Sequence, residues 1–305
     1  MESTAQTCTL PAASTSHTAG LSRRSFIVAA GACGVTVTPL AATGSTAAAA
    51  PGATGADPRL SNAGLIKLLA SLDGRAAPWW FTGHIYGVQL GRAPVPMVVC
   101  EGCEVYFARR LPNGDYLLRG NTLTFFRDAA TREWLDEFRN PLTGRRSEIR
   151  PNVLESGPES GFLYPSDGSG SYFVGSMGNT GQLNFKPPAP DASQPRGDFR
   201  WEESGDQVFA TTSRSIATPA QPWLEISTNF VPARPFFDPA AASVPAHGTV
   251  SYLSPWLKWM QMDEVQGHLL WHCGANKLGS IDELPADYRK RAEKLELMRV
   301  LAGPE

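Results

Sequence analysis

Histidine and cysteine, the most versatile residues for acid–base and metal chemistry, are scarce in this chain. One of the five histidines belongs to the N-terminal region, and the other four are His84, His247, His268 and His272. Alternate residues of a strand share a face, so extended segments would place His268 beside His272, and His84 beside Trp80 and Tyr86. Such rows of titratable and apolar side chains are typical of a small-molecule pocket.

If these rows line the interior of a barrel, they form a pocket with aromatic walls and a few polar groups. Arg119 and Glu225 stand on neighbouring segments and join this pocket in the same interpretation. His272 and Glu225 are then the candidate general acid and base. The residues expected to contact a ligand are Trp80, His84, Tyr86, Arg119 and Trp256. For any one of them, an ordinary surface or core position is the commoner alternative.

The cysteines do not predict a metal site. Cys100 and Cys103 form a CxxC pair, and Cys273 follows a histidine. Zinc needs four such groups converging on one point, whereas strand positions i and i+3 point to opposite faces. Buried thiols are the simpler expectation, with a disulfide from Cys100 or Cys103 to Cys273 as the alternative in an oxidising compartment.

No motif for a cofactor or for nucleophilic hydrolysis is present. The chain lacks a G-x-S-x-G elbow, an HExxH helix, a phosphate loop and a G-x-G-x-x-G fingerprint. No cofactor is therefore expected. The formal charge of −2 and the absence of a long basic stripe also argue against nucleic acid as a partner.

Aromatic and β-branched runs separated by Gly, Pro, Asn and Asp predict about ten strands. The expected strands span 79–90, 97–111, 115–127, a segment around 134–138, 198–203, 207–215, 223–231, 249–262 and 267–275, with further short strands within a long excursion at 151–195. A leucine stripe predicts a helix over 57–73 that packs on the sheet, and a basic amphipathic stretch predicts another over 282–302.

The absence of helices between these strands favours antiparallel pairing over βαβ topology. We therefore expect a mainly β fold, an antiparallel lipocalin-like (calycin-like) curled barrel with flanking N- and C-terminal helices. Its core would span 75–280 within a single β-rich domain of residues 51–305. With 42% hydrophobic residues, the chain has ample material for such a core.

Residues 1–50 have the pattern of an export signal. Arg23 and Arg24 precede a mildly apolar run that ends in small residues, as in a twin-arginine leader. This run is too interrupted by Gly, Thr and Pro for a stable membrane span, and none is expected in the mature chain. The pattern predicts recognition of both arginines by the twin-arginine translocase, and a periplasmic or secreted protein.

Several segments, taken in order, resemble a known family. They are the Trp79-Trp80 strand with Gly83, Tyr86 and Gly87, the Glu101-Gly102 pair, FFRDAATREWLDEFRNPLTG, SPWLKWMQM, GHLLWHCGANK and Asp282-Glu283-Leu284-Pro285. Together they resemble the domain-of-unknown-function family numbered 1838 across most of residues 75–290. The resemblance implies a β-rich, exported protein and brings no established activity.

Three functions fit these observations. The first is an exported barrel that binds a hydrophobic or aromatic small molecule in its interior. The second is a cofactor-free enzyme of the hydratase, isomerase or cyclase type that uses acid–base groups in the same pocket. The third is a structural envelope module without a pocket. The first two depend on an enclosed interior into which His84, Arg119 and His272 point, and the second also needs His272 to meet Glu225 or Arg119 there.

Overall fold

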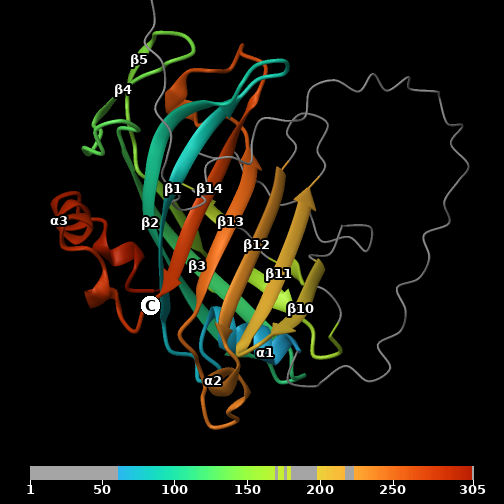
Figure 1. Cartoon of the computed structure of the whole chain (residues 1–305). Helices are drawn as coiled ribbons and strands as arrows, with labels where there is room; N and C mark the ends of the chain where they lie inside the picture. Colours follow the sequence, from blue (N-terminus) through green and yellow to red (C-terminus); the bar gives the residue numbers. More distant parts are fainter. Residues whose placement is uncertain (1–60, 169–170, 175–176, 180–197, 217–222, 304–305) are drawn as a thin grey trace, which may run out of the picture. The chain divides into compact units, whose positions relative to one another are not determined.

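The computed structural model describes residues 61–168, 171–174, 177–179, 198–216 and 223–303 (Figure 1). Of the two units into which the chain divides, Met1–Ala53 and Thr54–Glu305, only the second contains described residues. The expected export leader, with Arg23 and Arg24, lies outside them. No helix among the described residues has the length and apolar character needed to cross a membrane.

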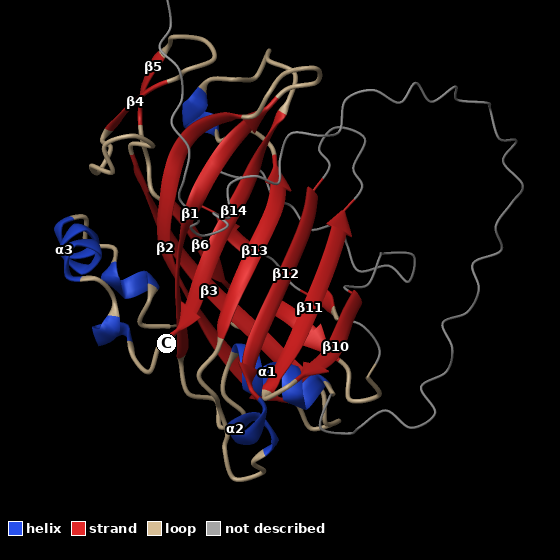
Figure 2. Ribbon diagram, in the orientation of Figure 1, coloured by secondary structure: helices blue, strands red, loops and turns tan. Residues whose placement is uncertain are grey.

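Antiparallel strands are the main secondary structure of the described residues (Figure 2). The strands of the main, twelve-stranded sheet are β1 (Ala77–Val88), β2 (Val95–Arg110), β3 (Tyr116–Arg127), β6 (Asn152–Ser156), β7 (Gly161–Tyr164), β8 (Tyr172–Val174), β9 (Met177–Asn179), β10 (Asp198–Ser204), β11 (Gln207–Ile216), β12 (Trp223–Pro232), β13 (His247–Ser254) and β14 (His268–Lys277). Their order is β10-β11-β12-β13-β14-β1-β2-β3-β6-β9, with β7 pairing β3 and β8. A separate two-stranded sheet consists of β4 (Glu137–Arg139) and β5 (Arg146–Glu148).

The expectation of a mainly β, antiparallel fold is therefore confirmed. The expected closed barrel is not confirmed, because no pairing among the described strands joins β10 to β8 or β9. The sheet nevertheless curls strongly. Leu118 of β3 and Val208 of β11 belong to one buried cluster, although five strands separate β3 from β11 in the sheet order.

The N-terminal helix fills one end of this curl. Helix α1 (Asn62–Leu69) begins after Ser61, whose hydroxyl accepts a hydrogen bond from the backbone N–H of Gly64. Its leucines belong to the same buried cluster, beside α2 (Ala233–Phe237), which the sequence did not predict. The expected packing of this helix on the sheet is confirmed, although α1 ends before residue 73.

The opposite face of β1–β3 is covered by the C-terminal segment. It contains η2 (Ile281–Glu283), α3 (Ala286–Lys294) and η3 (Met298–Val300), beside β2 in Figure 1. Tyr288 is fully buried there and donates a hydrogen bond from its hydroxyl to the carbonyl of Leu123 at 2.7 Å. The single helix expected over 282–302 is wrong, because Glu296 adopts a positive φ of 57° and interrupts it.

The strand expected over 249–262 also ends early. β13 stops at Ser254, immediately before Pro255, which has no N–H to continue the ladder. The chain then forms η1 (Lys258–Met260), in which Trp259 is buried in a second apolar cluster with Trp271. The two tryptophans of this stretch, Trp256 and Trp259, therefore serve core packing.

The pairing of β1 with β14 depends on Gly83. A Cβ at this position would lie 2.0 Å from the carbonyl oxygen of His272 and 2.5 Å from the Cα of Cys273. No side chain fits there without separating the two strands. Gly274, the outward-facing neighbour of Cys273, has no atom within 4 Å of its Cβ position.

We expect Gly83→Ala to destabilise the protein by about 3 kcal/mol or more, since overpacking against backbone cannot be relieved by a rotamer change. Gly274→Ala is the matched control on the adjacent strand and should change the free energy of unfolding by less than about 1 kcal/mol. Urea unfolding followed by tryptophan fluorescence measures both. Equal stability of the two variants would contradict the close approach.

Lys277 anchors helix α1 to the sheet. Its ammonium donates to the carbonyls of Lys67, Leu68 and Ala70 at 3.0, 2.8 and 2.5 Å. These carbonyls lie at the C-terminal end of the helix and lack partners within it. Burial lowers the pKa of Lys277 from its ordinary 10.5 to about 7.

This pKa predicts how stability changes with pH. Between pH 7 and 10.5 the unfolded chain binds the proton that the folded protein has released, so the contribution of Lys277 to the free energy of unfolding rises with pH, by at most ~1.4 kcal/mol per unit. Lys277→Met loses the three hydrogen bonds and this slope. Urea unfolding at pH 6.5, 8 and 9.5 should show a gap between wild type and variant that widens with pH. A constant gap would contradict the lowered pKa.

Candidate binding site within the curled sheet

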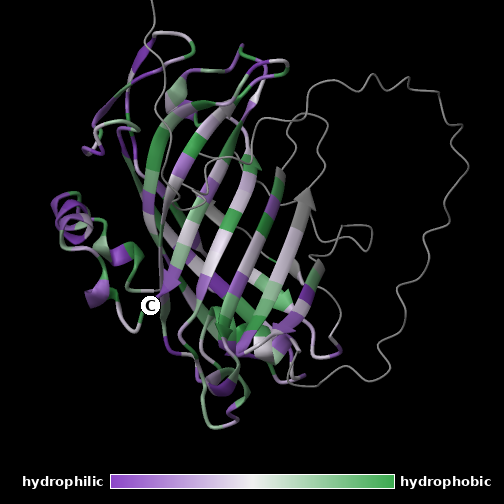
Figure 3. Ribbon diagram, viewed as in Figure 1, coloured by the Kyte–Doolittle hydropathy of each residue, from purple (hydrophilic) through white to green (hydrophobic). Residues whose placement is uncertain are grey.

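The two faces of β1 have different surroundings. Ile85 points into the curl, where it is fully buried in the cluster that contains Trp271. Trp80, of opposite parity, packs against the apolar cluster under the C-terminal segment. Figure 3 shows hydrophilic and hydrophobic bands alternating along the long strands. The inner face is thus the one that carries Phe81, Gly83 and Ile85.

His272 and Glu225 lie on opposite faces of the sheet. His272 is exposed on the outer face of β14, where its Nδ1 is 2.8 Å from the hydroxyl of Ser251. Glu225 stands opposite Tyr252 in the β12–β13 register, and Tyr252 packs on the inner cluster. The interior therefore does not bring the two candidate acid–base residues together. Alternation grouped the histidines correctly but did not reveal which face was enclosed.

His84 and Tyr86 also point outward, with their rings stacked at a centroid distance of 5.8 Å. Burial, followed by the positive charge of Arg132, lowers the pKa of His84. The Nδ1 of His84 is buried without a hydrogen-bond partner. These two residues stay together as expected, but outside the curl.

The other expected ligand contacts have structural surroundings. Arg119 lies on the outer face of β3 and donates to the carbonyl of Ser156 at 3.2 Å. Trp256 lies in the loop after β13 and donates its indole N–H to the carbonyl of Val265 at 2.8 Å. Of the six expected site residues that lie on strands, Glu225 alone points into the curl, and Trp256 packs against the cluster that contains Trp271.

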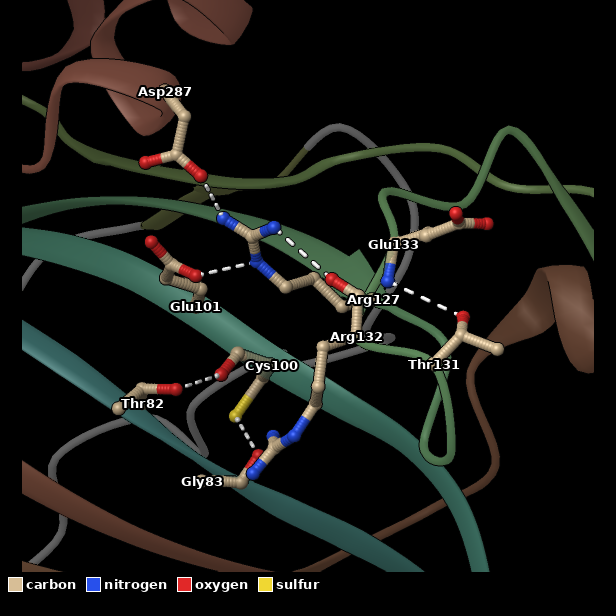
Figure 4. A network of polar contacts seen from close by, with 9 residues as sticks. All are labelled: Thr82, Gly83, Cys100, Glu101, Arg127, Thr131, Arg132, Glu133 and Asp287. Carbon is tan, nitrogen blue, oxygen red and sulfur yellow. Dashed lines mark hydrogen bonds and ion pairs between the residues drawn. The ribbon is translucent and has the colours of Figure 1, made fainter.

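An ion-pair network fixes the C-terminal segment to the outer face (Figure 4). Arg127 of β3 donates to Glu101 at 2.6 Å and to the carboxylate of Asp287, and its guanidinium lies 3.4 Å from the ring centre of Trp134. The hydrogen bond from Arg127 lowers the pKa of Asp287. The carbonyl of Arg132 accepts a further hydrogen bond from Arg127 at 3.1 Å. The network joins β2, β3 and α3, so we assign it a structural role.

The middle level of the inner face is formed mainly by small residues, with Phe81 and Trp201 as the two large ones. One row across the sheet runs Asn152, Thr124, Gly102, Phe81, Ala275, Gly248, Asn229, Ala210 and Trp201. Gly102 makes room for the ring of Phe81, which lies 2.3 Å from the Cβ position of that glycine. Glycine in a strand interior often marks a site of close approach.

Around this row, inward-pointing side chains keep part of their surface accessible. They are Phe81, Glu104, Tyr106, Trp201, Glu225, Ser227, Val250 and Tyr252. Five of them pack against two buried apolar clusters: Tyr106 and Trp201 against one, and Phe81, Val250 and Tyr252 against the other. An inward side chain retains accessible surface only where its neighbours leave space. We call this level, defined by those eight residues, the interior site.

Tyr252 connects the polar and aromatic parts of the interior site. Its ring stacks on Trp271 at 4.8 Å with an interplanar angle of 17°. Burial raises the pKa of Tyr252 well above its ordinary value, and the negative forms of Cys273, Cys100, Glu225 and Glu104 raise it further. The phenol therefore stays protonated and can donate a hydrogen bond at any physiological pH.

Two buried polar atoms on the inner row have no partner among the described residues. Asn152 is 3% exposed, and its Oδ1 accepts no hydrogen bond. The indole N–H of Trp201 is also buried without a partner. An unmet buried acceptor or donor costs about 1–3 kcal/mol. In a binding site, a ligand can supply the missing hydrogen bond.

The sequence interpretation did not single out Tyr252, Glu104, Asn152 or Trp201. A usable signal was present on β1 and β2, where Gly83 and Gly102 have inward parity and the bulky Trp80 has the other. A strand face that carries glycines leaves space, whereas one that carries large aromatics fills it. Following the glycines would have identified the interior.

Cys100 and Cys273 meet across Gly83, with their sulfur atoms 3.3 Å apart. Both are free thiols, as is Cys103, so the structure does not contain the alternative disulfide. The hydrogen bond to Cys273 and burial raise the pKa of Cys100 well above its ordinary value. No group of three or more His, Cys, Asp or Glu within the described residues could hold a metal ion.

Comparison with known proteins gives one match. Residues 217–296 match the family model described as Protein of unknown function (DUF1838). The expected resemblance is thereby confirmed over this segment, which covers only part of residues 75–290 and which we call the DUF1838 segment. It contributes Glu225 and Tyr252 to the interior site, whereas Glu104 precedes it. Neither the curated proteins nor the solved structures contain a match to this chain.

The buried thiols should resist alkylation in the folded protein. Cys100, Cys103 and Cys273 are at most 2% exposed, and the two CxxC thiols have raised pKa values. Incubation with iodoacetamide at pH 8, followed by peptide mass spectrometry, should leave all three unmodified. The same treatment in urea should modify all three. Rapid labelling without urea would show that the inner face opens.

Proposed function

We propose that the protein binds a hydrophobic or aromatic small molecule at the interior site. The observation that supports this best is the level of partly accessible, inward-pointing side chains between two fully buried clusters. Phe81, Tyr106, Trp201 and Tyr252 supply aromatic surface, and a few polar groups among them can orient a ligand. In this proposal the curled sheet acts as an incompletely closed, lipocalin-like container.

Export is part of the proposal. The twin-arginine pattern around Arg23 and Arg24 would direct the chain through the translocase to the periplasm or the medium. A ligand-binding protein at that location would meet small molecules outside the cytoplasm.

The enzymatic alternative is less well supported. It requires an acid and a base in contact with one substrate, and the sheet separates His272 from Glu225. We therefore expect His272→Gln to leave ligand binding unchanged.

The neutral probe N-phenyl-1-naphthylamine, whose fluorescence rises in apolar surroundings, can test binding. We expect saturable binding by the native protein. Val250→Trp, which enlarges an inward side chain of the interior site, should weaken it at least tenfold, about 1.4 kcal/mol. Thr249→Trp is the control, since Thr249 is the adjacent exposed residue on the outer face.

Unfolding curves should first show that both tryptophan variants are folded. Equal loss of binding in the two variants would place the probe outside the interior site, and no saturable binding by the native protein would contradict the proposed function. Native mass spectrometry of the exported protein can then identify a natural ligand that co-purifies.

A further inference from the structure

We infer that two copies of this chain pair through the outer face of the sheet at neutral pH, and that protonation of the histidines on this face separates them at acid pH. The surface consists of the outward-pointing residues of β11, β12, β13, β14 and β1, which we call the neutral face. It lies on the opposite side of the sheet from the interior site, so the inference does not depend on ligand binding.

The neutral face carries no charged residue. Alternate residues of its five strands point outward, and none of these is Asp, Glu, Lys or Arg, although 18% of the residues in the chain are charged. Charged residues return at both borders, with Arg200 and Glu202 on the outer side of β10 and the ion pair of Arg127 with Glu101 on β3 and β2. An uncharged, partly aromatic centre within a charged rim is typical of protein–protein interfaces.

One row across the neutral face is aromatic. The ring of Phe230 lies 6.1 Å from that of Phe209 and 5.6 Å from that of His247, with interplanar angles of 34° and 29°. The faces of these rings are turned toward one another, so their edges are presented to solvent. A carbohydrate stacks on an open ring face, whereas nucleic acid and anionic membranes need basic residues. The neutral face therefore suits a protein partner better than any of these.

The polar groups of the neutral face can satisfy those of a second copy. Thr211, Thr228 and Thr249 form a row of hydroxyl groups next to the aromatic row. A hydroxyl both donates and accepts a hydrogen bond, and so does a neutral imidazole. In a two-fold dimer the same patch meets itself, so a charged patch would meet its own charge. A patch of groups that both donate and accept meets complementary partners instead.

The neutral face is also large enough for a weak dimer. Five strands ~4.8 Å apart and about seven residues long, at ~3.3 Å per residue, cover ~550 Å² in each copy. Two copies together bury ~1,100 Å², just above the ~1,000 Å² that a specific interface needs. Ile226, which is 44% exposed, lies within this area and would be covered by the second copy. A Kd on the order of micromolar is expected for an interface of this size.

Every histidine of the described residues points outward from the neutral face. They are His84 on β1, His247 on β13, and His268 and His272 on β14. The hydrogen-bond partners of two of them are uncharged, since Nδ1 of His272 lies 2.8 Å from the hydroxyl of Ser251, and Nδ1 of His247 lies 2.6 Å from Oδ1 of Asn276. No ion pair joins any of these histidines to a carboxylate within the described part of the chain.

The titratable groups beside these histidines do not favour a positive charge. His84 stacks on Tyr86 and stands opposite His272 in register. Burial, followed by the positive charge of Arg132, lowers the pKa of His84. Glu101, the outward carboxylate of β2, is already held in its ion pair with β3. Below about pH 6.5 each copy therefore gains positive charge on a face that has no carboxylate to offset it. Like charges then meet across the dimer, and pairing weakens as the pH falls.

Sedimentation equilibrium of the full-length protein measures this pairing. At pH 7.5 we expect a monomer–dimer equilibrium, and at pH 5 a Kd at least tenfold weaker. Urea unfolding at both pH values should show that the protein remains folded, so that loss of the dimer is not loss of the fold. A protein that stays monomeric at pH 7.5 throughout the micromolar range would overturn the pairing and leave the neutral face to a different protein.

A charge placed on the neutral face tests where the two copies meet. Ile226→Lys should weaken pairing at least tenfold at pH 7.5, because each copy then meets its own lysine. Leu295→Lys is the matched control and should leave the Kd unchanged. Leu295 is 41% exposed and follows α3, which lies beside β2 in Figure 1. Equal effects of the two substitutions on the dimer would place the interface elsewhere.

The double variant His247→Gln with His272→Gln tests the acid release. Glutamine keeps an uncharged donor and acceptor at each position but does not titrate. The ratio of the Kd at pH 5 to the Kd at pH 7.5 should therefore fall at least threefold. If the native protein pairs through the neutral face but this ratio is the same in the double variant, the role of the histidines is wrong and the pairing stands. The native protein at two pH values needs no variant, so a misfolded substitution does not prevent the test.

Discussion

The pairing of β1 with β14 is the contact on which the rest of the sheet depends. It joins β2 and β3, from the first half of the described chain, to β11, β12 and β13 from the second, across ten registered residue pairs. Gly83 permits this approach because a Cβ there would overlap the backbone of β14. Without the β1–β14 pairing, the two halves would be separate sheets with exposed edges, and neither would enclose a space.

The β1–β14 pairing also determines which side chains face one another. Cys100 and Cys273 meet because each flanks Gly83, and Tyr252 lies on Trp271 one register step away. The curl then brings the inner faces of β2 and β3 toward those of β11 and β12, with α1 at one end. The outer face of β1–β3 is occupied by the C-terminal segment, held by Arg127 and Tyr288. One face is thus covered by the C-terminal segment, and the other faces into the curl.

Strand boundaries were largely predictable because their signals are local. The Asn113-Gly114 turn lies between β2 and β3, with Gly114 at φ 91°, and Gly205 at φ 62° lies between β10 and β11. Where the expected elements were too long, the reason was also local, as at Pro255 and Glu296. The candidate site was harder to predict. Of the residues that sequence reasoning named, Glu225 points inward, whereas it did not name Tyr252, which stacks on Trp271 of the neighbouring strand.

The residue pattern alone establishes an antiparallel β-rich chain, its turns and the sets of residues that share a face, since these follow from the two-residue period of a strand and from glycine and proline. That period is symmetric between the two faces. It cannot tell whether the row of His84 or the row of Gly83 is enclosed. The choice comes from long-range packing, in which the C-terminal segment covers the face of Trp80 and the sheet curls around the face of Gly83. For this reason His272 lies in water and Tyr252 lies inside.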